Sequence, residues 1–316
     1  MSAANAQVLE QYAIRPELTG PRRWWRATTD FVRTKPLGAA SALIILVLVA
    51  MAVAPSVFAT DDSPNTGTIS ERLQGPSGEH LFGTDQFGRD MYSRIIYGAR
   101  TSMIIGILVI LVSSTIATIL GVFSGYFGGW VDILVQRVVD IGISLPGLIF
   151  IILVVTSLQD FPPESTGLDP SGRAVTRIAV SLGILVALGS SRVIRGQTIA
   201  TKQNQYVEAA RVVGARDLRI IVRHILPNVF TVIIVGASIQ IGSAILVESS
   251  LSFLGYGVQP PTASWGRMLT EARVQITNHP HLAIFPGAAI FLTVYSFNMF
   301  GDALRDVLDP RLRGSR

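Results

Sequence analysis

The sequence predicts an all-α membrane protein that crosses the bilayer six times. Hydrophobic residues make up 49% of the chain and charged residues only 15%, whereas soluble domains average about 25% charged residues. Apolar runs of about 20 residues, the length that a helix needs to cross a bilayer, recur along the sequence. The chain contains no cysteine, which excludes a disulfide framework, a thiolate metal site and a cysteine nucleophile.

Six apolar runs are long enough to span the membrane as helices. They cover residues 37–59, 101–131, 141–159, 174–191, 228–254 and 281–301. The fourth run is the weakest, because it is short and carries Arg177 near one end, where a long side chain can reach the headgroups. The first run is too long for the core of a cleavable signal peptide, so we expect it to stay in the protein.

The positions of lysine and arginine predict the orientation. Most of the 26 basic residues lie before the first span, in the loop 192–227 and after the last span. Positive residues favour the cytoplasmic side, so both termini are expected there. The predicted parts are a cytoplasmic segment 1–36, the first transmembrane helix 37–59, an extracytoplasmic segment 60–100, a core 101–304 with five transmembrane helices and a cytoplasmic loop 192–227, and a cytoplasmic tail 305–316.

The extracytoplasmic segment 60–100 contains a short amphipathic pattern. Apolar residues from Met91 to Ala99 alternate with Arg94 and other arginines. This pattern predicts a helix that lies on the outer surface of the membrane. Asp85 precedes it and is predicted to cap it.

The basic stretch from Tyr206 to Asn228 is the most informative part of the sequence. Its apolar residues recur with roughly helical spacing, while Gly214 interrupts the pattern and Pro227 follows its last turn. Glycine and proline at these places predict two short helices that meet at Gly214 and end at Pro227, where the fifth span begins. Because the loop is expected in the cytoplasm, a soluble partner can bind it there.

The motif in this stretch resembles a loop of one family of membrane proteins. Glu208-Ala209-Ala210, then Gly214, then Leu226-Pro227 resemble the loop shared by permease subunits of binding-protein-dependent ABC importers. His224 before x-Leu-Pro resembles the branch that imports dipeptides, oligopeptides and nickel. Further segments resemble the C-type subunit of that branch, and the resemblance covers residues 25–313. These segments are 82–90, 125–130, 251–255, 259–261 and 308–311.

The resemblance implies a type I ABC importer permease fold in the bacterial inner membrane. It implies that the loop is a coupling helix that docks on an ATPase subunit. The expected coupling residues are Glu208, Ala209, Ala210, Gly214, Asp217, His224, Leu226 and Pro227. Glu208 is expected to pair with an arginine or a backbone amide of the ATPase. The alternative is a weak local pair with Arg211.

The expected partners are a homologous second permease subunit, two ABC ATPase subunits, an extracytoplasmic substrate-binding protein and the lipid bilayer. The chain cannot hydrolyse ATP through a phosphate-binding loop, because neither Lys35 nor Lys202 stands in a Gly-Lys-Ser/Thr context. ATP and Mg²⁺ are therefore expected on the ATPase subunits, with no cofactor and no catalytic residue on this chain. We expect no metal at the His279 and His281 pair, and no nucleic-acid binding, because the basic residues flank spans.

Polar residues inside spans are the candidates for the substrate path. Glu248 is the strongest, because a carboxylate in a membrane helix is costly unless it faces a cavity, a partner or the protein interior. The alternatives for Glu248 are a position near the outer headgroups and a hydrogen bond that ties two helices. Gln240, Ser243 and Asn298 are weaker candidates, since single neutral polar residues commonly join helices.

The substrate is expected to be a dipeptide or oligopeptide, with nickel or another small solute as the alternative within the family. A secondary transporter driven by an ion gradient is the main alternative of another class. That class commonly has several buried acids and inverted repeats, whereas this sequence has one buried acid and no visible repeat. A scaffold or receptor subunit is disfavoured, because the longest outer segment is about residues 60–100.

Overall fold

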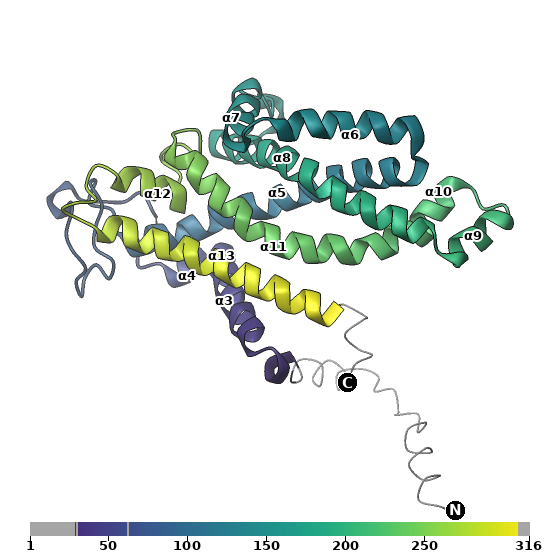
Figure 1. The fold of residues 1–316 in the computed structure, drawn as a ribbon. Helices are drawn as coiled ribbons and strands as arrows, with labels where there is room; N and C mark the ends of the chain where they lie inside the picture. The colour runs from purple at the N-terminus through teal and green to yellow at the C-terminus, as the bar shows by residue number, and fades with distance from the viewer. Residues whose placement is uncertain (1–28, 30, 62, 309–316) are drawn as a thin grey trace, which may run out of the picture.

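The computed structural model describes residues 29, 31–61 and 63–308. Most of the predicted segment 1–36 and of the predicted tail 305–316 lies outside this part of the chain. Within the described residues the fold is all-α, as predicted, and the only β-pairing is two isolated bridges, Gly67 with Arg89 and Thr84 with Asp90. The helices form an elongated bundle (Figure 1).

Five helical stretches are long and apolar enough to cross a membrane. They are α3 (Pro36–Val53), α5 (Met91–Phe127), α8 (Pro170–Lys202), the stretch Asp217–Phe253 that contains α11 (Leu226–Phe253), and α13 (His281–Leu308). A sixth crossing is made if the bent pair α6 (Gly129–Ser144) and α7 (Gly147–Ser157) counts as one span. The shorter elements are α4 (Pro55–Phe58), η1 (Ile69–Glu71), η2 (Glu164–Thr166), α9 (Gln205–Val212), α10 (Asp217–Ile220), η3 (Ile221–Ile225) and α12 (Trp265–Ala272).

The predicted third span over 141–159 is not one straight helix. Helix α6 ends at Ser144, and α7 starts after Pro146 at an angle of 101° to it. Proline disfavours a helical backbone in the residue before it, and Leu145 is extended, with φ −80° and ψ 140°. Figure 1 shows α6 running along the bundle and α7 turning away at its end.

The helix predicted over residues 91–99 exists, but it is the buried start of a long helix and not an amphipathic helix on the outer surface. Residues 91–99 are the first turns of α5, which continues for 37 residues without a break, a length of about 55 Å. Met91, Ile95 and Ala99 are buried in the bundle, because the apolar positions continue the face of the span that follows. The cap is Asp90, whose carboxylate accepts from the backbone N–H of Ser93 at 2.8 Å, whereas the predicted cap Asp85 accepts from Phe87 and Arg89 in the preceding loop.

Pro227 does not end the second short helix, contrary to the prediction. The chain stays helical from Asp217 to Phe253 and passes through η3, a π-helical turn, just before Pro227. The N–H of Leu226 bonds to the carbonyl of Ile221, five residues earlier. Pro227 follows in the first turn of α11, where its missing N–H costs little.

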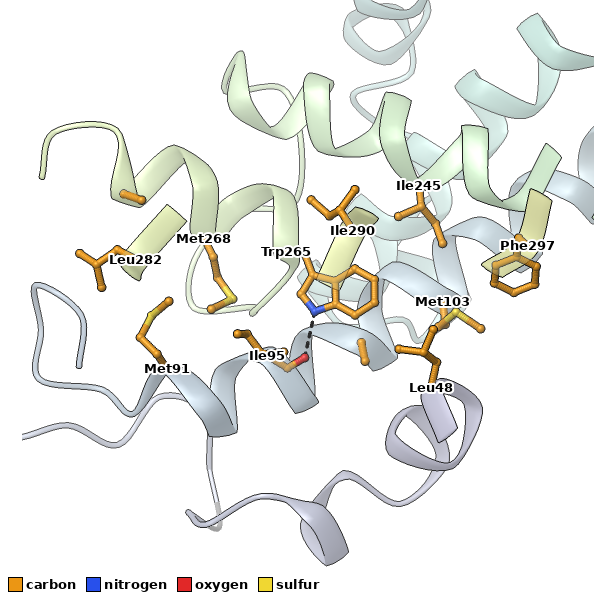
Figure 2. Packing of buried hydrophobic residues seen from close by; sticks show 12 residues of the cluster. Leu48, Met91, Ile95, Met103, Ile245, Trp265, Met268, Leu282, Ile290 and Phe297 are labelled. Carbon is orange, nitrogen blue, oxygen red and sulfur yellow. Dashed lines mark hydrogen bonds between the residues drawn. The ribbon is translucent and has the colours of Figure 1, made fainter. Parts of the chain in front are cut away.

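The end of the bundle that carries α12 is held together by packing around Trp265. This side chain is fully buried, and its indole N–H donates to the carbonyl of Ile95 at 2.9 Å. Figure 2 shows the indole among side chains of α5, α11 and α13, including Met103, Ile245 and Ile290. Helix α12 is thereby fixed to three of the long helices.

A buried charge cluster lies at the same end of the bundle. Glu271 of α12 accepts from Arg89 at 2.9 Å and from Arg94 at 3.0 Å, and Arg267 pairs with it at 3.2 Å. Asp85 pairs with Arg89 at 2.6 Å. The Arg94 side chain is only 1% exposed, so its charge requires these carboxylates. The cluster ties the loop before α5 to α12.

Candidate functional site

Helices α9 and α10 project from one end of the bundle, opposite α12 (Figure 1). The turn between them and its flanks expose large apolar side chains: Val212 is 87% exposed, Val213 88% and Leu218 72%. Large exposed apolar side chains so near one another in the sequence of a basic segment favour a contact surface for another protein. We refer to Val212, Val213 and Leu218 as the apolar tip.

Gly214 gives the apolar tip its shape. Its φ of +84° lies in the left-handed region, which favours glycine. The N–H of Ala215 bonds to the carbonyl of Ala210, and the N–H of Gly214 bonds to that of Arg211, both at 3.0 Å. This pair of bonds is a Schellman motif, which ends α9. The predicted break between two helices at Gly214 is confirmed.

The loop that carries the apolar tip is fixed to α5 and α8. The phenol of Tyr126, at the end of α5, donates to Asp217 Oδ1 at 2.6 Å. The ammonium of Lys202, at the end of α8, donates to the carbonyl of Tyr126. Beneath these contacts lies a buried apolar layer from both helices and the loop. It contains Ala117, Val122, Ala187, Ile194, Val207, Ile220, Ile221 and Ile225.

The residues predicted for coupling divide into two groups. Glu208, Ala209 and Gly214 are exposed beside the apolar tip. Three of the others attach the loop to the bundle: Asp217 binds Tyr126, and Ala210 and Leu226 pack on the buried layer. The His224 ring lies 5.9 Å from that of Tyr206 within the loop, and Pro227 lines a groove. Glu208 takes part in none of the ion pairs formed by the described residues, so its local pair with Arg211 is not made.

Sequence reasoning missed the apolar tip and its two anchors. Val213 and Leu218 share the roughly helical spacing of Ile221 and Ile225, yet of these four only the isoleucines are buried. The adjacent pair Val212-Val213 could have indicated the apolar tip. Neighbouring residues on a helix point in different directions, so both valines cannot face the bundle. Tyr126 gave no signal, since its partner Asp217 is 91 residues away.

A second feature is a groove of about 750 Å³ between α8 and α11. Its polar lining comes from Ser190 and Gln197 of α8 and from Asn228, Thr231 and Gln240 of α11. Arg305, near the end of α13, completes the lining. Ser190 Oγ lies 3.1 Å from Gln240 Oε1, within hydrogen-bonding distance.

Of the four path candidates, only Gln240 lines this groove. Ser243 is exposed and Asn298 is half-buried, and both lie elsewhere on their helices. Glu248 is fully buried and accepts a hydrogen bond from Ser252 of the same helix at 2.7 Å. Its second oxygen has no hydrogen-bond partner among the described residues. As for metals, no group of three or more His, Cys, Asp or Glu side chains comes together in the part of the chain that the structure describes.

Comparison with known proteins gives matches over nearly the whole chain. Residues 117–314 match the family described as "Binding-protein-dependent transport system inner membrane component". The glutathione transport system permease protein GsiD of Pectobacterium atrosepticum is 40% identical over 310 residues, which cover 98% of this chain and 96% of the relative. GsiD of Escherichia coli O6:K15:H31 is 38% identical over 313 residues, 99% of this chain and 97% of the relative. GsiD of Shigella boydii is 38% identical over 290 residues, 92% and 91% of the two chains.

Proposed function

Because this chain belongs to the binding-protein-dependent transport system inner membrane components, and is thus a permease subunit of an ABC importer, we propose that it forms half of the translocation pore. The other half is a homologous second permease subunit. Two ABC ATPase subunits bind and hydrolyse ATP with Mg²⁺, and an extracytoplasmic binding protein delivers the substrate. The chain is a multi-pass protein of the bacterial inner membrane, and in this proposal both termini and the apolar tip lie in the cytoplasm.

The exposed apolar tip is the observation that carries the coupling role. Val212, Val213 and Leu218 are at least 72% exposed, and burying such side chains in a cleft of an ATPase yields roughly 1.5–3 kcal/mol each. The neighbouring Glu208 is unpaired and exposed, so it can accept a hydrogen bond from the same partner. The surrounding arginines give the surface a positive charge that favours an acidic rim on the cleft.

The attachment of the loop provides the route by which ATPase movement reaches the membrane. Closure of the ATPase pair displaces α9 and α10. Tyr126 and Lys202 join this loop to the ends of α5 and α8, and the buried layer beneath resists compression because protein interiors are close-packed. The two longest helices near the groove therefore move with the loop, which alternates access to the substrate path.

The proposed substrate is a short peptide. Relatives that match this chain over almost its whole length are named glutathione transport system permease proteins, and glutathione is a tripeptide. Glutathione is therefore the first substrate to test, followed by dipeptides and longer peptides.

The coupling role is tested by the double change Glu208→Arg with Gly214→Pro. Proline fixes φ near −65°, which is incompatible with the +84° at this position, and the arginine reverses the charge beside the apolar tip. We expect a normally inserted permease that no longer retains the ATPase subunits during purification and loses uptake at least tenfold.

A matched control lies at the opposite end of the bundle. Glu164 is exposed and Gly167 has a φ of +71° with open space around it. Glu164→Arg with Gly167→Pro makes the same chemical changes there and leaves ATPase retention intact. Full ATPase retention and uptake in the first variant contradict the coupling role.

A further inference from the structure

The groove between α8 and α11 follows the half of α11 that adjoins the loop with the apolar tip. Its lining runs along α11 from Pro227 to Gln240, which corresponds to about 20 Å of helix. Pro227 adjoins the loop that carries the apolar tip, so the groove begins at that end of the bundle. Beyond Gln240, helices α5, α8 and α11 are tightly packed through Ile105, Leu182 and Ala244, each at most 2% exposed.

The lining has an unusual composition for a membrane bundle. Amide and hydroxyl side chains from α5, α8 and α11 alternate with apolar ones. They are Ser114, Ser190, Gln197, Asn228, Thr231 and Gln240. Among the described residues Arg305 is the one charged group in the lining, and no carboxylate or imidazole joins it. The wall therefore offers hydrogen bonds and one positive charge.

Arg305 is held beside the groove by close packing of α13 on α11. A Cβ at Gly301 would lie 2.6 Å from Ile239 Cγ1, so the absence of a side chain allows the two helices to approach. Arg305 follows one turn later in α13 and is exposed. It takes part in none of the ion pairs that the described chain forms, although its neighbour Asp306 pairs with Lys35.

We propose that this groove is the inner part of the substrate path and that Arg305 binds a carboxylate of a short peptide there. The amides of Gln197, Asn228 and Gln240 hydrogen-bond the peptide backbone. This assignment rests on the proposed permease function and adds to it a ligand chemistry and a binding residue. A guanidinium can bind a carboxylate through two parallel hydrogen bonds, which gives the peptide terminus a fixed position.

The groove fits a peptide better than a metal ion. Its volume of about 750 Å³ falls within the roughly 300–1,000 Å³ of small-molecule sites. Nickel and other transition metals prefer imidazole and thiolate ligands, and harder cations prefer carboxylates. The described lining contains none of these groups and places a positive charge at the site. The structure therefore favours peptide over nickel among the two substrate classes expected from the sequence.

The charge of the groove can be measured without knowing the substrate. The chain contains no cysteine, so Thr231→Cys introduces a single thiol into the lining. The measured quantity is the ratio of the reaction rate of this thiol with anionic MTSES to its rate with cationic MTSET. In the assembled complex with cysteine-free partners, we expect this ratio to be higher than for a free thiol in solution. Adding Arg305→Gln should lower that ratio about fivefold. An unchanged ratio overturns the assignment of Arg305.

Phe230 provides the matched position for this experiment. It is adjacent to Thr231 and exposed, but it does not line the groove. Arg305→Gln should leave the labelling of Phe230→Cys unchanged. A similar change at both positions means that Arg305 acts on the whole surface, which also overturns the assignment.

Uptake measurements test the bound ligand itself. In proteoliposomes with the complete transporter, binding protein and ATP, Arg305→Gln should lower the kcat/KM for glutathione uptake about tenfold, because a charge-assisted hydrogen bond is lost. Arg305→Lys should retain most of the uptake, and ATPase stimulation by the binding protein should be unchanged in both variants. If the wild-type complex shows no ATP-dependent peptide uptake, the proposed function is contradicted. The cysteine experiment still tests separately whether Arg305 sets the charge of the groove.

A lipid phosphate presents similar chemistry to Arg305, and the same assay separates it from a peptide. If Arg305 only binds lipid headgroups, Arg305→Gln lowers the amount of stable complex and leaves uptake per complex unchanged. Equal kcat/KM per complex in wild type and Arg305→Gln therefore contradicts peptide binding in the groove.

Discussion

The phenol of Tyr126 lies where the end of α5 meets α8 and α10. It donates to Asp217 on α10, and its backbone carbonyl accepts from Lys202 on α8. One residue thus links three helices at the base of the loop. Its ring also lies 5.9 Å from the guanidinium of Arg211, which adds a cation–π contact to α9.

Removing the hydroxyl of Tyr126 tests this link. Tyr126→Phe keeps the ring and loses the bond to Asp217, which should weaken the attachment of the loop by about 1 kcal/mol. Backbone amides of residues 205–220 should then exchange with deuterium about fivefold faster. Tyr295→Phe, a change at a partly exposed tyrosine of α13, serves as control. Equal protection in wild type and Tyr126→Phe shows that the bond does not hold the loop.

At the residue scale the sequence predicted what depends on local chemistry. The need for a left-handed residue between two helices is local, so Gly214 was identified from its neighbours. The cap of α5 was placed five residues too early, at Asp85 and not at Asp90, because both aspartates precede the same helix. Asp85 instead pairs with Arg89, in a charge cluster that Arg89 and Arg94 form with Glu271. Glu271 is far away in the sequence, so no local pattern reveals this cluster.

At the scale of elements, α12 is held to α5 by charge as well as by packing. Glu271 receives three arginines and is only 11% exposed. Removing one member of a buried ion cluster leaves the others without compensation, which typically costs about 3–5 kcal/mol.

Glu271→Gln should therefore destabilise the protein by about 3 kcal/mol. We expect a markedly lower temperature of thermal denaturation in detergent, with α12 losing protection first. Glu164→Gln removes a carboxylate from an exposed pair with Arg173 and should cost less than about 1 kcal/mol. If both variants denature at the same temperature as wild type, the cluster does not stabilise this end of the bundle.

The sequence predicted where helices form better than where they break. All six apolar runs correspond to helices, because composition and length determine that property. A bend at Pro146 interrupts the third run, whereas the helix continues through Pro227, where an end was predicted. At Pro146 the helix ends, and the preceding Leu145 is extended. At Pro227 the helix continues, because the π-turn before it has already changed the hydrogen-bond pattern. Sequence alone does not distinguish the two outcomes, since packing around each proline decides between them.

At the scale of the whole molecule, the two ends of the bundle carry different surfaces. One end has the apolar tip and surrounding arginines, and the other has α12 and the segment 63–90 (Figure 1). The basic end is predicted to face the cytoplasm.

Single cysteines test this orientation directly, since the chain has none of its own. Val213 is 88% exposed at one end and Phe87 is 53% exposed at the other. A membrane-impermeant thiol reagent added to intact cells should label Phe87→Cys and spare Val213→Cys, and should label both after the membrane is opened. The reverse pattern shows that the apolar tip faces outward and removes the proposed contact with the ATPases.

The unbroken course of α5 has a consequence for how the two membrane faces influence each other. Its 37 residues contain no proline, so we expect a rigid helix. The two ends of a rigid helix cannot shift independently along its axis. Near one end, Arg94 pairs with Glu271 of α12, and at the other end Tyr126 bonds to Asp217 of α10. Thermodynamic linkage makes such communication reciprocal. Under the proposed function, we therefore expect a substrate-loaded binding protein that contacts the Arg94 end of α5 to favour closure of the ATPases as strongly as their closure favours its binding.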